Sequence, residues 1–140
     1  MKKKTLKKLS DALREKVYYK IPELHYGGCG FAAVALIEAL EKMGEHARLV
    51  TRNHYRHILV EVKVQSGRSV RKVIIDCFMT GYTWDNRYAY GDLKKLKKDL
   101  EVELGWNDMF DRRQVPELRR KIRKVVKDVL KPCTEPIEIT

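Results

Sequence analysis

Residues 29–43, CGFAAVALIEALEKM, are apolar on nearly every side of the helix that their composition predicts. Such a helix has to be buried, and in a chain of this length a sheet is the natural surface to bury it. Gly44 follows directly. Many helices end at a residue in the left-handed conformation, which glycine adopts easily. We therefore expect a buried helix over 29–43 that packs against a sheet.

The strands of that sheet are predicted from the next segment of the chain. Residues 47–51, ARLVT, predict a first strand, and residues 57–64 predict a second strand whose side chains alternate between its two faces. His57, Leu59, Glu61 and Lys63 share one face, and Ile58, Val60, Val62 and Val64 share the other. A turn at Ser66-Gly67 leads into a third strand, 70–76, so residues 57–76 predict an antiparallel hairpin. The expected fold class is α+β with a small antiparallel sheet.

Basic helices are expected on both sides of this core. Leu6, Leu9, Leu13 and Val17 recur at helical spacing within residues 4–19, with lysine and arginine between them. Asp92 predicts the start of a lysine-rich helix over 92–100, and Pro116 the start of a last helix that ends near Leu130. Residues 78–91 are rich in aromatic side chains and are expected to form a surface loop. We expect one domain over residues 1–132 and a loosely ordered tail over 133–140.

Positive charge is concentrated in the predicted helices. The formal net charge is +11, and residues 1–20 hold eight lysines and arginines against two acids. Phosphate groups are neutralised by clustered lysine and arginine, so nucleic acid or an acidic protein is a candidate partner. The alternative is a solvated helix face that binds nothing. The candidate polyanion-binding residues are Lys94, Lys95, Lys97, Lys98, Arg119, Arg120, Lys121, Arg123 and Lys124.

Several classes of protein are disfavoured by the sequence. No apolar run approaches the roughly 20 residues that span a bilayer, and no apolar segment follows the charged start as in a secretory signal, so no membrane is expected as a partner. Three irregularly spaced cysteines suit a reducing cytoplasm, although a Cys77–Cys133 bridge stays open. The cysteines and histidines lack metal-ligand spacing, so no metal or cofactor is expected.

Cys29, His57 and Asp76 follow the chain order of a thiol catalytic triad. Cys29 starts the apolar helix after two glycines, and His57 and Asp76 lie at matching ends of the hairpin. A helix N-terminus favours the thiolate, which is the nucleophile, and an imidazole takes up and later delivers the proton. An aspartate on the other ring nitrogen fixes the tautomer and stabilises the imidazolium.

Each of these residues alone has an ordinary explanation: a buried cysteine, a histidine at a strand edge, an aspartate at a turn. Their joint placement favours the triad. His54 and His25 compete with His57 for the role of base. His25 or Tyr26 is also a candidate oxyanion donor or pocket residue, and Trp84 a candidate wall of the substrate cleft.

Over residues 25–80 the sequence resembles the core of transglutaminase-like proteins, which belong with papain-like enzymes to one broad superfamily. The resemblance rests on Cys29-Gly30-Phe31-Ala32-Ala33 with Met43-Gly44, on Ala47-Arg48-Leu49-Val50, on the His57–Val62 strand and on Ile75-Asp76. The sequence departs from the family after the nucleophile, where Gly30-Phe31-Ala32 stands, and after Asp76, where Cys77 replaces the usual proline.

The resemblance implies a nucleophile helix packed on an antiparallel sheet and a cysteine-dependent peptidase, deamidase or transglutaminase-type acyl transferase. Its substrate would be a peptide or protein with a carboxamide or peptide bond, and the acyl group would pass through a thioester on Cys29. The alternative function is a non-catalytic transglutaminase-like module whose basic helices bind nucleic acid or an acidic protein. The presence of all three triad residues in the sequence favours the enzymatic function over the binding module.

Overall fold

The computed structural model describes residues 1–25, 28–52, 57–76, 81–83, 88–102 and 110–131. Its helices are α1 (Lys3–Leu13), the π-helical turn η1 (Arg14–Tyr18), the 3-10 helix η2 (Pro22–His25), α2 (Cys29–Lys42), α3 (Leu93–Val102), the 3-10 helix η3 (Arg112–Gln114) and α4 (Val115–Leu130). Its strands are β1 (Ala47–Arg52), β2 (His57–Ser66), β3 (Ser69–Asp76), β4 (Gly81–Thr83) and β5 (Ala89–Tyr90).

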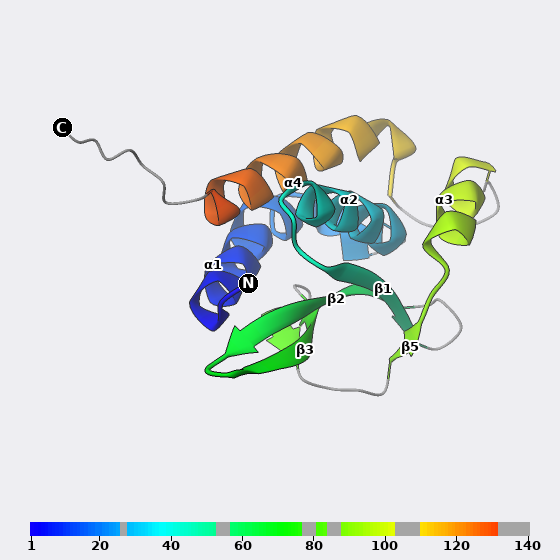
Figure 1. Cartoon of the computed structure of the whole chain (residues 1–140). Helices are drawn as coiled ribbons and strands as arrows, with labels where there is room; N and C mark the ends of the chain where they lie inside the picture. The colour runs from blue at the N-terminus through cyan, green and yellow to red at the C-terminus, as the bar shows by residue number, and fades with distance from the viewer. Residues whose placement is uncertain (26–27, 53–56, 77–80, 84–87, 103–109, 132–140) are drawn as a thin grey trace.

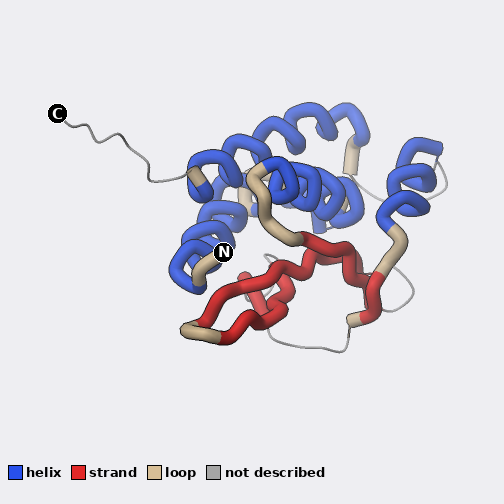
Figure 2. Tube along the Cα trace, in the orientation of Figure 1, coloured by secondary structure: helices blue, strands red, loops and turns tan. Residues whose placement is uncertain are grey.

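All five strands form one antiparallel sheet in the order β4-β3-β2-β1-β5. Helices cover one face of the sheet, as Figure 2 shows. The α+β fold class and the antiparallel sheet predicted from the sequence are therefore confirmed.

The buried helix α2 ends as its sequence predicts. Gly44 has a φ of 81°, its N–H donates to Glu41 O at 3.0 Å, and the Glu45 N–H donates to Leu40 O at 3.0 Å. These two bonds satisfy carbonyls that the end of a helix otherwise leaves unpaired. Gly44 thus ends α2 and turns the chain toward β1.

The hairpin of β2 and β3 has the predicted alternation. Val62 pairs with Val73 and Val60 with Ile75, and these residues are buried against the helices. Their neighbours Glu61 and Lys63 lie on the opposite face. Gly67 turns the hairpin with a φ of 63°, a conformation that glycine adopts without strain.

The helices form two layers over the sheet. α1 and α2 contact strands, and α4 packs across α1 and α2 on the side away from the sheet (Figure 1). The buried side of α4 consists of Leu118, Ile122, Val125 and Val126. Its charged residues are consequently left on the outer surface.

Two predicted elements differ in the structure, and a third lies outside the described residues. The first helix, expected over 4–19, ends in a π-helical turn, because the Tyr19 N–H donates to Arg14 O, five residues back. The expected loop over 78–91 contains two strands: β4, which pairs with β3, and β5, which pairs with β1. The loop prediction is therefore wrong for these strands. The predicted tail, 133–140, lies outside the described residues.

Candidate active site

Cys29 is the first residue of α2 and lies half-buried against the hydrophobic core. The N-cap of the helix is Gly28, no side chain caps this end, and the first turn carries no acidic residue. A negative charge on the Cys29 sulfur would therefore meet the positive end of the helix dipole, and the first turn of α2 adds no carboxylate to oppose it. The thiol is not part of a disulfide.

Close packing fixes the residue before the cysteine. A Cβ added to Gly28 would lie 2.6 Å from Leu24 Cδ2, 2.9 Å from Leu24 Cα and 3.0 Å from Phe110 Cδ1. Because the Leu24 Cα belongs to the backbone, no rotamer change can relieve this overlap. Glycine at position 28 lets η2 run directly beneath the start of α2.

The start of β2 lies against the same end of α2. A Cβ at Gly30 would lie 3.5 Å from Ile58 Cδ1, and Ile58 directly follows His57. The fold thus brings the Ile58 side chain next to the residue that follows Cys29, although 28 positions separate Cys29 and His57 along the chain.

His57 and Asp76 share one face of the sheet but do not lie directly opposite each other. Val60 pairs with Ile75, so the same register sets Asp76 across from Leu59. Two residues on neighbouring strands in this diagonal relation are about 7–8 Å apart at their Cα atoms, within reach of long side chains. The expected pairing of His57 opposite Asp76 is thus shifted by two residues.

The three proposed triad residues are not joined by hydrogen bonds in this structure. His57 is exposed and Asp76 half-buried on the face away from the helices, whereas Cys29 lies on the helical side. Within the described part of the chain, His57 makes no hydrogen bond or ion pair with Asp76 or Cys29. The structure therefore does not bring the three side chains together.

The remaining pocket candidates are only partly described. His25 is the last residue of η2, and its side chain, like Tyr26, His54 and Trp84, lies outside the described residues. Cys77 and Cys133, the cysteines of the alternative disulfide, lie outside them as well.

No protein-family model, curated protein or solved structure matches this chain.

Among the described residues, no three or more histidine, cysteine, aspartate or glutamate side chains come together as a metal site. The described helices include none that is long and apolar enough to cross a membrane.

The candidate polyanion-binding residues divide into paired and unpaired cations. Lys97 binds Glu38 at 2.7 Å, Arg119 lies 3.8 Å from the same carboxylate, Arg120 pairs with Glu117, and Lys124 pairs with Asp128 at 3.2 Å. Lys94, Lys95, Lys98, Lys121 and Arg123 have no ion pair with any described residue. These ion pairs leave fewer positive charges for an anionic partner than the number of lysines and arginines in the sequence implies.

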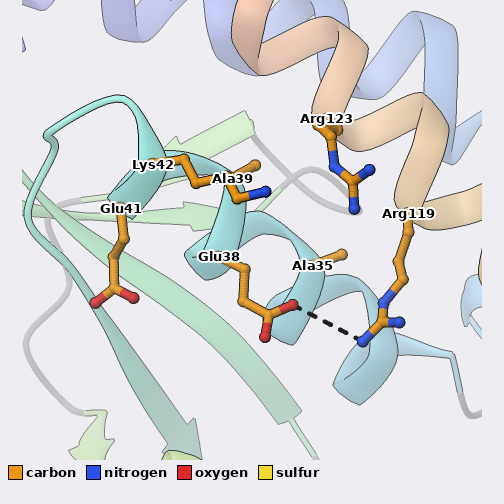
Figure 3. Close-up of a pocket in the computed structure, with 7 residues that line it drawn as sticks. All are labelled: Ala35, Glu38, Ala39, Glu41, Lys42, Arg119 and Arg123. Carbon is orange, nitrogen blue, oxygen red and sulfur yellow. Dashed lines mark ion pairs between the residues drawn. The ribbon is translucent and has the colours of Figure 1, made fainter.

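Glu38 is a structural residue that the sequence analysis missed. It is the only charged residue within 29–40, and it links α2 to Lys97 of α3 and Arg119 of α4. Figure 3 shows it beside a groove of about 470 Å³ between α2 and α4, with Arg119 and Arg123 on the other side. The sequence feature that could have identified Glu38 is a single acidic residue within an otherwise apolar helix.

Proposed function

We propose that this chain is a transglutaminase-like thiol enzyme that hydrolyses or transfers an acyl group through Cys29, His57 and Asp76. The observation that carries the proposal is the position of Cys29. It begins a buried apolar helix whose first turn has neither a side-chain cap nor an acid, and the side chain of Ile58, the residue after His57, lies beside that turn.

The chemistry follows from the three residue types. The Cys29 thiolate attacks the carbonyl carbon of a carboxamide or peptide bond, a new S–C bond forms, and the oxygen carries the negative charge. The C–N bond then breaks as the His57 imidazolium gives its proton to the leaving amine. Water or a second amine attacks the thioester while His57 takes its proton, which releases the acyl product and restores the thiolate.

The proposal requires the backbone at the start of β2 to rearrange when substrate binds, because His57 lies on the face of the sheet away from Cys29. His57 is the first residue of β2, it is exposed, and no hydrogen bond or ion pair with a described residue holds it in its present position. Asp76 lies one diagonal step away on that same face, so the end of β3 has to move with His57 for Asp76 to orient the ring and stabilise its charged form. A reducing, cytoplasmic setting suits a mechanism that depends on a thiol.

Selective alkylation tests the proposal. A limiting amount of iodoacetamide at mildly acidic pH should label Cys29 ahead of Cys77 and Cys133, because only a thiolate reacts and ordinary thiols are protonated there. Peptide mass spectrometry measures the order. His57→Ala should slow Cys29 labelling on the order of tenfold, since the imidazolium that stabilises the thiolate is lost.

His46→Ala is the matched control, because His46 is also an exposed histidine but precedes β1, away from the start of α2. It should leave the labelling rate unchanged. If Cys29 reacts most slowly of the three cysteines, or if His57→Ala has no effect, the proposed function is wrong.

A second candidate function, the non-catalytic binding module, is favoured by a different observation. α3 and α4 expose cations that have no ion pair with a described residue, and α4 forms the outermost layer of the fold. Such a surface suits nucleic acid or an acidic protein. Unexceptional reactivity at Cys29 together with salt-dependent binding of a polyanion would favour this second function.

A further inference from the structure

One face of the sheet is covered by no helix in the described part of the chain (Figure 2). Glu61 and Lys63 of β2 lie on this face, and Arg48 and Lys72 lie there as their partners in the strand register. Tyr90 of β5 lies there too, because its hydroxyl contacts Glu61. We call this surface the outer sheet face and define it by the side chains Arg48, Arg52, Glu61, Lys63, Lys72, Tyr88 and Tyr90.

Tyr90 is held across the outer sheet face by hydrogen bonds. Its hydroxyl donates to Glu61 Oε1 at 3.1 Å, and Lys72 Nζ donates to the same hydroxyl at 3.2 Å. The side chain starts on the edge strand β5 and so reaches past β1 to residues of β2 and β3. A ring whose position is fixed in advance loses little conformational freedom when a ligand packs on it.

Arginine side chains lie over both tyrosines at this edge of the sheet. The Arg48 guanidinium is 3.7 Å from the centre of the Tyr90 ring, and the Arg52 guanidinium is 5.8 Å from the centre of the Tyr88 ring. Lys72 Nζ is 5.8 Å from the Tyr90 ring centre but 3.2 Å from its hydroxyl, so it lies at the end of the ring and not closely over its face. Tyr90 is 46% exposed, which leaves ring surface for a ligand. Unpaired nucleobases stack on surfaces of this kind, aromatic rings and guanidinium planes.

Two lysines on the outer sheet face are placed to hold an anion. Lys63 and Lys72 are direct partners in the β2–β3 register, and both are exposed. Like charges directly opposite each other destabilise a sheet. Neither lysine makes an ion pair with a described residue, so an anion bound between them would remove this repulsion. The four arginines and lysines of the described strands on this face also outnumber its two acids, Glu61 and Asp76.

We propose that the outer sheet face binds single-stranded nucleic acid. One base stacks on Tyr90, a second on Tyr88, and a phosphate lies between Lys63 and Lys72. The hydrogen bond between Lys72 and Tyr90 puts the stacking surface next to the phosphate site, as base and phosphate are adjacent in a nucleotide. A duplex keeps its bases within its own stack, and an acidic polypeptide has no bases, so the tyrosines discriminate against both.

This binding site is separate from the sites considered above. Cys29 lies on the helical side of the sheet, and the lysines of α3 and the arginines of α4 belong to the helices. Binding at the outer sheet face therefore depends neither on the thiol chemistry nor on the basic helices.

Fluorescence anisotropy with a labelled oligouridylate of about ten nucleotides tests the proposal on the full chain. Tyr90→Leu should weaken binding about tenfold, the effect of losing one stacked base. Tyr90→Phe keeps the ring and loses only the hydroxyl, so it should retain most of the affinity. Tyr19→Leu is the matched control, because Tyr19 is also an exposed tyrosine, at 67%, but follows η1 among the helices. It should leave the affinity unchanged.

Two further measurements separate stacking from attraction by charge. Lys63→Gln should make the slope of log affinity against log salt shallower by about 0.7, the value for one phosphate contact to a single strand. Tyr90→Leu should not change the affinity for a duplex of the same length, because its bases are paired.

The proposal is overturned if Tyr90→Leu binds oligouridylate as tightly as the unmodified protein, or if it weakens the binding of single strand and duplex equally. Polyglutamate that displaces the labelled strand as well as unlabelled oligouridylate does, at the same concentration of charge, would also overturn it and would identify an acidic protein as the partner.

Photocrosslinking locates the site without any substitution. An oligonucleotide that contains 4-thiouridine is irradiated with the unmodified protein, and mass spectrometry identifies the tryptic peptides that carry the adduct. The adduct is expected on peptide 88–94, which contains both tyrosines. Adducts confined to residues 95–130 would overturn the proposal and assign the nucleic acid to the basic helices.

Discussion

Gly28 and Gly30 flank Cys29, yet the two glycines have different surroundings. A Cβ at Gly28 would overlap the backbone of Leu24, whereas a Cβ at Gly30 would make ordinary contacts with the side chains of Leu100 and Ile58. Gly30 also lies inside α2, where alanine is a better helix former than glycine. The first glycine is required by packing, and the second is not.

Gly28→Ala should therefore lower the free energy of unfolding by about 2 kcal/mol, the usual cost of forcing a methyl group into a filled space. Gly30→Ala should raise it by about 0.5 kcal/mol, because alanine restricts the unfolded chain and suits the helix. Urea denaturation followed by circular dichroism measures both. Equal effects of the two substitutions would show that the close approach of Leu24 is not maintained.

At the scale of the single element, α4 begins with a well-defined ion pair. Arg120 Nε donates to Glu117 Oε2 at 3.0 Å, and Glu117 lies in the first turn of the helix. The hydrogen bond from Arg120, followed by its charge and that of Lys121, holds the pKa of Glu117 below its ordinary value. Both groups are exposed, so the pair contributes little to stability.

The pKa of Glu117, measured by NMR titration of its side-chain carboxyl carbon, should be lower than that of an unpaired glutamate. Arg120→Gln should raise it toward the ordinary value. Because the folded pKa is depressed, any stabilisation from Glu117 is present above its unfolded pKa and is lost as the pH falls through the folded pKa.

Asp111 provides the internal control for this titration. Its pKa is lowered chiefly by the side-chain hydrogen bond from Arg113, a pair that Arg120→Gln leaves intact. A Glu117 pKa that does not move in the variant, or an Asp111 pKa that moves with it, would contradict the assignment of the shift to Arg120.

The elements differed in how far the sequence could predict them. α2 was predictable because it is apolar over many residues up to Gly44, and the β2–β3 hairpin because its side chains alternate on both sides of Gly67. Asp92 was correctly expected to cap α3, and its carboxylate accepts from the Lys95 N–H at 3.1 Å. β4 and β5 were missed because strands of three and two residues have no measurable period and form only against an existing sheet edge.

The candidate site was predictable only as a chain order. Sequence placed Cys29 at a helix start and His57 and Asp76 at strand ends, and the structure has them there. The diagonal relation of His57 and Asp76 depends on strand register, which the turn length alone left open. The meeting of Tyr90, Glu61 and Lys72 depends on tertiary packing between segments far apart in sequence.

At the scale of the whole molecule, α4 lies on the side of α1 and α2 that faces away from the sheet. The basic surface of α4 and the β2–β3 hairpin are therefore in different layers, and α3 carries further lysines. Replacing Lys94, Lys95 and Lys98 by alanine removes three exposed charges without breaking the Lys97–Glu38 pair. If α3 binds nucleic acid, this variant should bind a fluorescent oligonucleotide more weakly, measured by anisotropy. The slope of log affinity against log salt should become shallower by roughly 2 to 3, because fewer counterions are released.

Lys3, Lys4 and Lys8 of α1, replaced together by alanine, provide a control with the same loss of charge on another helix. Labelling of Cys29 should be unchanged in both variants. An equal loss of binding in the two variants would indicate that net charge alone attracts the oligonucleotide. If the unmodified protein does not bind the oligonucleotide at low salt, the lysines of α3 serve another purpose.

The two outermost strands have a further consequence for how copies of this chain meet. β4 offers three residues and β5 only two along the borders of the sheet. β4 pairs with β3 only at Ile74, Ile75 and Asp76, so residues 69–73 of β3 have no described strand on their outer side, and a second chain would add a strand at that border. Arg71 and Lys72 lie within that border, and the net charge of +11 repels identical neighbours, so charge rather than strand length opposes growth of the sheet from one copy to the next.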